Sequence, residues 1–220
     1  MRDPDTGPDS APSDGAVLPE MPETPAEREA RKLIKRQRRN LRKAEAEGFM
    51  AGICAMLRPG DLALDCGANM GVVTTQLARS GADVIAYEPD PFAFSHLDDR
   101  FSCHDTVTLV NAALGTHEGT VQLMRAENFE ANPEGASVKS TILDGGRAID
   151  QASAIDVTLL DFPALVAQLV AERGEIAFVK MDIEGAEGVV LRDSAQLIAS
   201  YKPVMVIESA TTSEYNEVAA

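Results

Sequence analysis

Apolar runs of four to seven residues alternate with longer amphipathic segments between residues 62 and 208. Short apolar runs predict buried strands, and the longer segments between them predict helices. Strands that alternate with helices in this way predict a mostly parallel sheet covered by helices on both faces, so the expected fold class is α/β. The expected strands are 62–65, 84–88, 107–110, 155–159, 176–182 and 204–208, and the expected helices are 71–79, 92–101, 162–173 and a last one from 184–187 to about 200.

Residues outside this alternation add three expectations. Residues 48–57 form a further apolar helix, and Asp161 is the expected N-cap of helix 162–173, which Gly174 ends. Val121–Met124 is expected to form a short hairpin, with strand 107–110 or with a later segment. Residues 125–153 have weak periodicity and many small polar residues, so they are expected to form a long loop that covers the active site or is mobile.

The first 47 residues differ from the rest. Residues 1–25 are acidic and rich in proline and are expected to be disordered, whereas residues 26–47 predict a basic amphipathic helix with a narrow apolar stripe. That helix either docks its stripe on the domain or on a second copy, or it binds an anionic partner, a membrane surface or nucleic acid. Residues 48–220 are the expected catalytic domain.

The formal net charge of −15 belongs wholly to residues 48–220, because residues 1–47 hold ten basic and ten acidic side chains. An acidic domain disfavours a polyanionic nucleic-acid substrate and mildly favours a cationic cofactor. The three cysteines, Cys54, Cys66 and Cys103, are not spaced like metal ligands. Their number and positions are typical of a protein in a reducing compartment. No apolar run reaches membrane-spanning length, and the first twenty residues do not form a signal peptide, so a cytoplasmic location is expected.

The segment Asp65–Gly71 follows a predicted strand and opens a predicted helix, and Glu88 ends the next strand 23 residues after Asp65. Gly67 and Gly71 let the backbone approach a ligand where a side chain would clash. An acid at the position of Glu88 can accept hydrogen bonds from ribose hydroxyls. This arrangement predicts a nucleoside-binding unit.

This loop departs from the phosphate-binding loop of NAD-dependent enzymes. Asn69 stands where G-x-G-x-x-G has its second glycine, no third glycine follows Gly71, and Asp65 would repel a phosphate. S-adenosylmethionine has no phosphate and carries a sulfonium and an ammonium, so an acid at the start of the loop suits it better. The loop therefore favours a methyl donor, and an NAD-dependent oxidoreductase is the less favoured hypothesis.

Four motifs, taken in order, resemble those of the FkbM family of S-adenosylmethionine-dependent methyltransferases. They are Leu64–Gly71, Tyr87–Pro91, Asn111–Gly115 and Val179–Glu187. The resemblance covers roughly residues 55–210, and the last motif is the most specific. It implies a class I methyltransferase fold, which is Rossmann-like, and, for many members, O-methylation of sugar or natural-product hydroxyls.

The resemblance also implies roles for particular residues. Lys180, Asp182 and Glu184 would face the transferred methyl group and the acceptor, with Asp182 as the first candidate for general base. Asp182 and Glu184 share strand parity and could hold a divalent ion together, but two acids are too few to assign a metal site. The implied cofactor-binding residues are Asp65, Gly67, Asn69 and Gly71 at the methionine end, Glu88 at the ribose, and Asn111 and Ala112 beside the adenine.

The class I sheet usually ends with an antiparallel hairpin, and only twelve residues follow Glu208. The hairpin is therefore expected to be missing or shortened, and a partner chain, such as a second copy in a homo-oligomer, could cover the exposed edge. Two functions follow from these patterns. The first is a methyltransferase that acts on a small-molecule or sugar hydroxyl. The alternative is a non-catalytic S-adenosylmethionine-binding or interaction module whose basic helix recruits an anionic partner.

Overall fold

The structure, a computed structural model, describes residues 28, 31, 32, 35, 48–124, 154–183 and 185–208. The chain divides into two compact units, Met1–Ala46 and Glu47–Ala220. In the first unit, Arg28, Arg31, Lys32 and Lys35 are helical and exposed. The disordered tail, the rest of the basic helix, the loop 125–153 and the segment after Glu208 lie outside the described residues and stay predictions.

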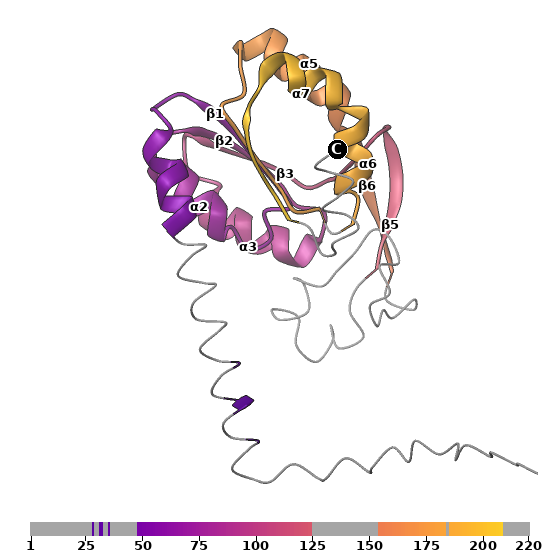
Figure 1. The fold of residues 1–220 in the computed structure, drawn as a ribbon. Helices are drawn as coiled ribbons and strands as arrows, with labels where there is room; N and C mark the ends of the chain where they lie inside the picture. Colours follow the sequence, from indigo (N-terminus) through magenta and orange to yellow (C-terminus); the bar gives the residue numbers. More distant parts are fainter. Residues whose placement is uncertain are drawn as a thin grey trace, which may run out of the picture. The chain divides into compact units, whose positions relative to one another are not determined.

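The second unit is built on a five-stranded sheet in the order β3-β2-β1-β7-β8, in which every neighbouring pair is parallel (Figure 1). The chain moves outward from β1 to β3 and later returns to β7 beside β1, so the strand order reverses between β1 and β7. Ligands of open α/β sheets bind at such a reversal. The strands are β1 (Leu62–Cys66), β2 (Asp83–Tyr87), β3 (Val107–Val110), β7 (Phe178–Met181) and β8 (Val204–Ile207).

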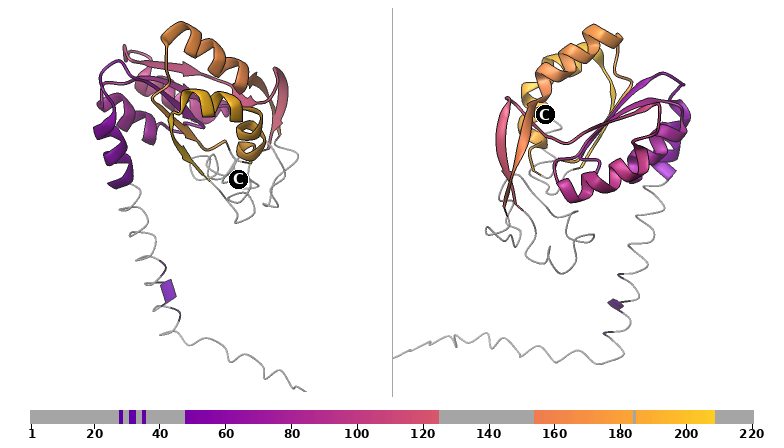
Figure 2. Two further views of the ribbon diagram at one scale, coloured as in Figure 1. Left: turned by 45° about the horizontal axis from the view of Figure 1, so that its top comes forward. Right: turned by 180° about the vertical axis from the view of Figure 1, so that it is seen from behind.

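Helices cover both faces of this sheet (Figure 2), which confirms the expected α/β class. On one face, α2 (Val72–Arg79) and the helical residues 48–56 pack on Ala63 and Phe178, and α3 (Pro91–Phe101) packs on Ala86. On the other face, Leu64, Val179 and Met181 form the main core cluster with side chains from the later helices. Those helices are α5 (Phe162–Arg173), α6 (Glu187–Asp193) and α7 (Ala195–Tyr201).

The single helix expected up to residue 200 is wrong, because it is divided into α6 and α7 at Ser194. Ser194 is fully buried, and its backbone ends the first helix and begins the second. The break lets Val190 on α6 and Ile198 on α7 reach the same core cluster. No glycine or proline marks this break, so the sequence pattern gave no sign of it.

A second, three-stranded sheet has the order β4-β6-β5 and lies beside the first one (Figure 1). Its strands are β4 (Ala113–Gly115), β5 (Gly119–Leu123) and β6 (Ile155–Asp161). β5 runs antiparallel to β6, which confirms that the 121–124 segment pairs with a later segment. The expectation that 155–159 joins the main parallel sheet is wrong. Exposed Asp156 and Thr158 alternate with buried Val157 and Leu159, a pattern that suits a half-buried sheet.

The expected ends of α5 are confirmed. The Asp161 carboxylate accepts a hydrogen bond from the Ala164 backbone N–H at 3.1 Å, and Gly174 ends the helix with a φ of 94°.

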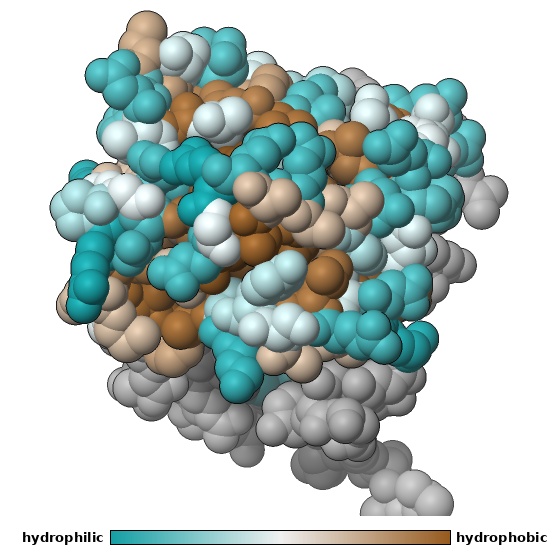
Figure 3. Space-filling view, turned by 90° about the horizontal axis from the view of Figure 1, so that it is seen from above, coloured by the Kyte–Doolittle hydropathy of each residue, from teal (hydrophilic) through white to brown (hydrophobic). Residues whose placement is uncertain are grey.

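Figure 3 views this unit from above, on the side of α5 and α7, and shows apolar residues gathered between polar ones. Within the described residues, no helix is long and apolar enough to cross a membrane.

Candidate cofactor and acceptor site

The candidate site lies at the carboxyl end of the five-stranded sheet. Strand register aligns Cys66 with Tyr87 and with Met181, and it continues the row to Val110 and Ile207. The residues that directly follow these strands therefore come together at one edge. They are Gly67, Glu88, Asn111, Asp182 and Glu208.

Gly67 brings the end of β1 against the end of β7. Its φ is 78°, and a Cβ atom built at this position would lie 1.8 Å from the carbonyl oxygen of Asp182. The Gly67 N–H donates to the Tyr87 carbonyl at 2.9 Å, and the Asp182 N–H donates to the Cys66 carbonyl at 3.0 Å. Only glycine permits this approach, so the loop that begins at Gly67 is fixed against both neighbouring strands.

Asn69 gives the loop a glycine-like turn without a glycine. Its φ is 49°, in the left-handed region that asparagine tolerates better than most residues. The Asn69 N–H donates to Glu88 Oε2 at 2.8 Å, and its Oδ1 accepts from the Met70 N–H at 2.8 Å. Because Asn69 takes a left-handed φ that glycine also adopts readily, asparagine at this position is weaker evidence about the cofactor than the sequence pattern suggested.

Glu88 is buried after β2 with its carboxylate at the site. Oε1 accepts from the Asp90 N–H and Oε2 from the Asn69 N–H, both at 2.8 Å. Burial raises the pKa of Glu88 to about 7, against the opposing effect of these two hydrogen bonds. Each oxygen keeps a lone pair for a further donor. The geometry therefore fits the expected role toward a ribose, which stays a prediction.

We expect Glu88 to make the free energy of unfolding fall as pH rises. The unfolded chain releases the Glu88 proton near pH 4.5 and the folded protein near pH 7, so the folded state binds this proton more tightly. Between those values the wild-type protein should lose up to about 3 kcal/mol relative to Glu88→Gln, which has no such proton. Urea unfolding of both proteins at pH 5 and pH 8 measures this difference. Parallel pH profiles would contradict the raised pKa.

Asp65 and Lys180 point toward α2 from adjacent strands. The Asp65 side chain is fully buried, and its Oδ2 accepts a hydrogen bond from Thr74 Oγ1 at 2.6 Å. Lys180 Nζ lies 3.5 Å from Asp65 Oδ1. Asp65 is therefore held inside the fold, and any contribution that it makes at the methionine end of the cofactor must act through the loop. Its role as a cofactor residue stays a prediction.

Lys180 also contacts Gly67 and Asp182. Its Nζ donates to the Gly67 carbonyl oxygen at 2.5 Å and lies 3.2 Å from Asp182 Oδ2. Burial lowers the pKa of Lys180, but the charges of Asp65 and Asp182 outweigh that effect, and the pKa lies above its usual value. Lys180 is therefore protonated at neutral pH and cannot act as a base. The Asp182 side chain is 30% exposed, so this carboxylate is the more accessible of the two acids beside Lys180.

The remaining predicted residues are placed as follows. Asn111 Nδ2 donates to the carbonyl of Glu88 at 2.7 Å and to that of Pro89 at 3.2 Å, so Asn111 fixes the turn after β2. Ala112 is buried next to it. Whether these two residues also contact an adenine stays a prediction. Glu184 lies outside the described residues.

Three further residues, which the sequence patterns did not assign to the site, hold parts of it in place. Thr74 on α2 binds Asp65, and Arg100 on α3 donates to the Met70 carbonyl at 3.2 Å. Glu187 is buried and accepts from the backbone N–H groups of Ile183 at 2.8 Å and Gly185 at 2.9 Å. The one signal for Thr74 was a polar residue on the apolar face of a predicted helix, which is too weak to name a partner.

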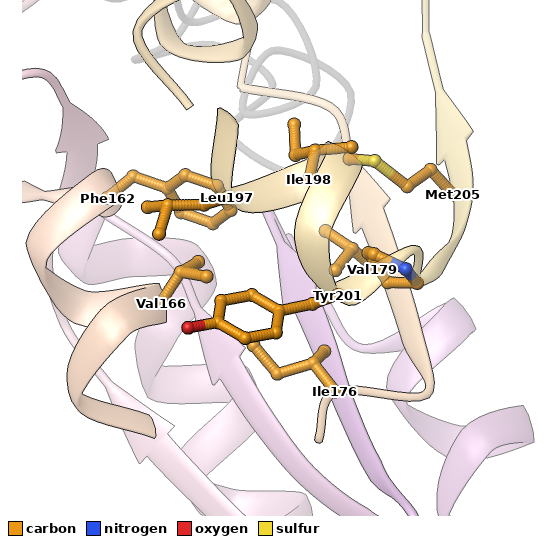
Figure 4. Close-up of a pocket in the computed structure, with 9 residues that line it drawn as sticks. Phe162, Val166, Ile176, Val179, Leu197, Ile198, Tyr201 and Met205 are labelled. Carbon is orange, nitrogen blue, oxygen red and sulfur yellow. The ribbon is translucent and has the colours of Figure 1, made fainter. Parts of the chain in front are cut away.

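An apolar hollow elsewhere in the unit is not this site. It lies between α5, α7 and the β7–β8 part of the sheet and is lined by side chains such as Phe162, Leu197, Tyr201 and Met205 (Figure 4). None of the candidate site residues lines it. Among the described residues, no group of three or more His, Cys, Asp or Glu side chains could hold a metal ion.

The parallel sheet with strand order 3-2-1-7-8, the glycine loop after its central strand and the acid after the next strand define a doubly wound α/β protein of the Rossmann-like type. The family model of the methyltransferase FkbM domain matches residues 65–219. The chain belongs to this family of S-adenosylmethionine-dependent methyltransferases. This match confirms the resemblance from which the roles of the site residues were inferred.

Similar proteins include 31-O-demethyl-FK506 methyltransferase FkbM from Streptomyces tacrolimicus, which is 29% identical over 160 residues, 61% of this chain and 60% of that protein. The probable ribosomal RNA small subunit methyltransferase A of Methanosarcina mazei is 41% identical over 56 residues, 26% of this chain and 21% of that protein. The chain thus spans at most about three fifths of these relatives. Precorrin-6y C5,15-methyltransferase from Geobacter metallireducens has a TM-score of 0.44 at 12% identity, over 80% of this chain and 67% of that structure.

Proposed function

We propose that this protein transfers the methyl group of S-adenosylmethionine to a hydroxyl group of a small molecule or sugar. The observation that carries the proposal is the partly exposed Asp182 carboxylate, which lies at the strand reversal beside the glycine loop. The family match supports the methyl donor, and the similarity to 31-O-demethyl-FK506 methyltransferase FkbM, whose name describes an O-methyl position, supports a hydroxyl acceptor. When bound, S-adenosylmethionine supplies an electrophilic methyl group.

The proposed cofactor contacts lie along the carboxyl edge of the sheet. In this proposal the loop from Gly67 to Gly71 holds the methionine end, and Glu88 accepts hydrogen bonds from the ribose hydroxyls. Asn111 and Ala112 flank the adenine. Gly67, Asn69 and Glu88 are held before the cofactor binds, because the Gly67 N–H donates to the Tyr87 carbonyl and the Glu88 carboxylate accepts from the N–H groups of Asn69 and Asp90.

Asp182 serves the acceptor in this proposal. It orients the hydroxyl and accepts its proton while the new O–C bond forms and the S–C bond breaks. Most of the rate enhancement in such a displacement comes from holding the nucleophile about 3 Å from the methyl carbon and in line with it. Glu184 would be a second carboxylate that faces the acceptor, and this role stays a prediction.

Ligand-dependent thermal unfolding tests the cofactor assignment. We expect S-adenosylmethionine and S-adenosylhomocysteine to raise the Tm and NAD to leave it unchanged, because a ligand at a hundred times its Kd stabilises the folded state by about 2.7 kcal/mol. The same shift with NAD, or none with the first two ligands, would contradict the proposal.

A transfer assay tests the acceptor class. Release of S-adenosylhomocysteine is measured with a panel of polyhydroxylated small molecules, with sugars and with structured RNA. The RNA is included because a short match to ribosomal RNA methyltransferases exists, although the acidic charge of residues 48–220 disfavours a polyanion. Release with the hydroxylated compounds supports the proposal, and release with RNA alone overturns it. Cofactor binding without turnover on any acceptor would instead favour the non-catalytic module.

A further inference from the structure

The Lys180 ammonium joins two neighbouring strands at the site. Strand register places Lys180 on β7 directly beside Asp65 on β1, so both side chains leave the same face of the sheet. The Lys180 Nζ lies within 3.5 Å of three oxygen atoms, which belong to Gly67, Asp182 and Asp65. The Lys180 side chain is only 11% exposed.

These three contacts differ in kind. Lys180 Nζ donates a hydrogen bond to the Gly67 carbonyl at 2.5 Å and forms an ion pair with Asp182 Oδ2 at 3.2 Å, whereas the buried Asp65 Oδ1 at 3.5 Å interacts with its charge and has no hydrogen-bond partner. Lys180 thus directs its charge and its donors at the loop and at two carboxylates of the site. Its expected place facing the methyl group stays a prediction.

We propose that Lys180 is a positioning residue that holds the Gly67 carbonyl and the Asp182 carboxylate in one fixed arrangement. This inference rests on the proposed function, because it concerns the same site. Lys180 acts on the cofactor through the shape of the loop that starts at Gly67. Its removal should therefore weaken cofactor binding in a protein that is still folded.

The experiment compares variants that keep the fold. Lys180→Met removes the donors but leaves the Asp65 charge buried without its cation, which lowers stability by itself. The combined variant Asp65→Asn with Lys180→Met removes both charges, and Asp65→Asn alone is its matched control. Circular dichroism establishes the Tm of each protein, and calorimetry measures the Kd for S-adenosylmethionine well below that Tm.

We expect the combined variant to bind S-adenosylmethionine at least about tenfold more weakly than Asp65→Asn, as the loss of one charge-assisted hydrogen bond predicts. A purely structural lysine would lower the Tm and leave the Kd of the folded protein unchanged. Equal Kd values for the combined variant and Asp65→Asn would therefore overturn this inference and leave the proposed function unaffected. Absence of binding by the wild-type protein would overturn the proposed function and the inference together.

Discussion

Gly67→Ala is expected to abolish cofactor binding and to destabilise the fold severely. The added methyl group would lie 1.8 Å from the Asp182 carbonyl oxygen, and this neighbour is backbone that cannot rotate away. Either the Gly67 loop or the end of β7 must move, and both carry the proposed site. The left-handed φ of 78° adds a cost of about 1–2 kcal/mol for alanine. Together these effects should lower the free energy of unfolding by more than about 4 kcal/mol, in the range that only a few mechanisms reach.

Gly60→Ala separates the two contributions to this effect. Gly60 has a φ of 88°, close to that of Gly67, but a Cβ atom there would meet nothing within 4 Å. This control should lose only the conformational cost of about 1–2 kcal/mol and keep its affinity for S-adenosylmethionine. Urea unfolding and calorimetry of both variants give the comparison. If the two variants unfold alike and bind equally well, the close approach of β1 and β7 does not limit the site.

The main sheet followed from sequence because its two central strands, β1 and β7, are buried at every position. Leu62–Cys66 is buried at every position, and such runs are visible as apolar stretches that end in a polar residue or a glycine. The parallel strands and the edge at which Glu88, Asn111 and Asp182 meet were predicted on that basis. β4 was missed, because Ala113–Gly115 has three residues and no periodicity to recognise.

The partners within the site did not follow from sequence. The pattern at Gly67 predicted a close approach of the backbone to a ligand, but the neighbour that requires glycine is the Asp182 carbonyl. The resemblance implied that Lys180 faces the methyl group and the acceptor, and nothing in the sequence indicated its hydrogen bond to Gly67, which spans 113 residues. Only the register of β1 against β7 brings these groups together, and strand order is a property of the folded sheet. The fold was thus more predictable than its contacts.

Asp182→Asn is expected to lower turnover by a factor of about 10²–10⁴ and to leave cofactor affinity nearly unchanged, because it removes only the proposed proton acceptor. The amide keeps the size of the side chain and an oxygen that can face Lys180 Nζ, which lies 3.2 Å from the carboxylate in the wild-type protein. The loop and the Glu88 carboxylate stay in place. Initial rates with a saturating acceptor and calorimetry with S-adenosylmethionine measure the two quantities.

Asp156→Ala is the matched control, because Asp156 is an exposed acid on β6, in the second sheet. It should keep both the turnover and the affinity of the wild-type protein. A large loss of turnover in Asp182→Asn with unchanged Kd assigns the carboxylate to the chemical step, since only an interaction made in the transition state has that signature. If Asp182→Asn turns over as fast as Asp156→Ala, Asp182 is not the base, and the proton must leave to Glu184 or to solvent.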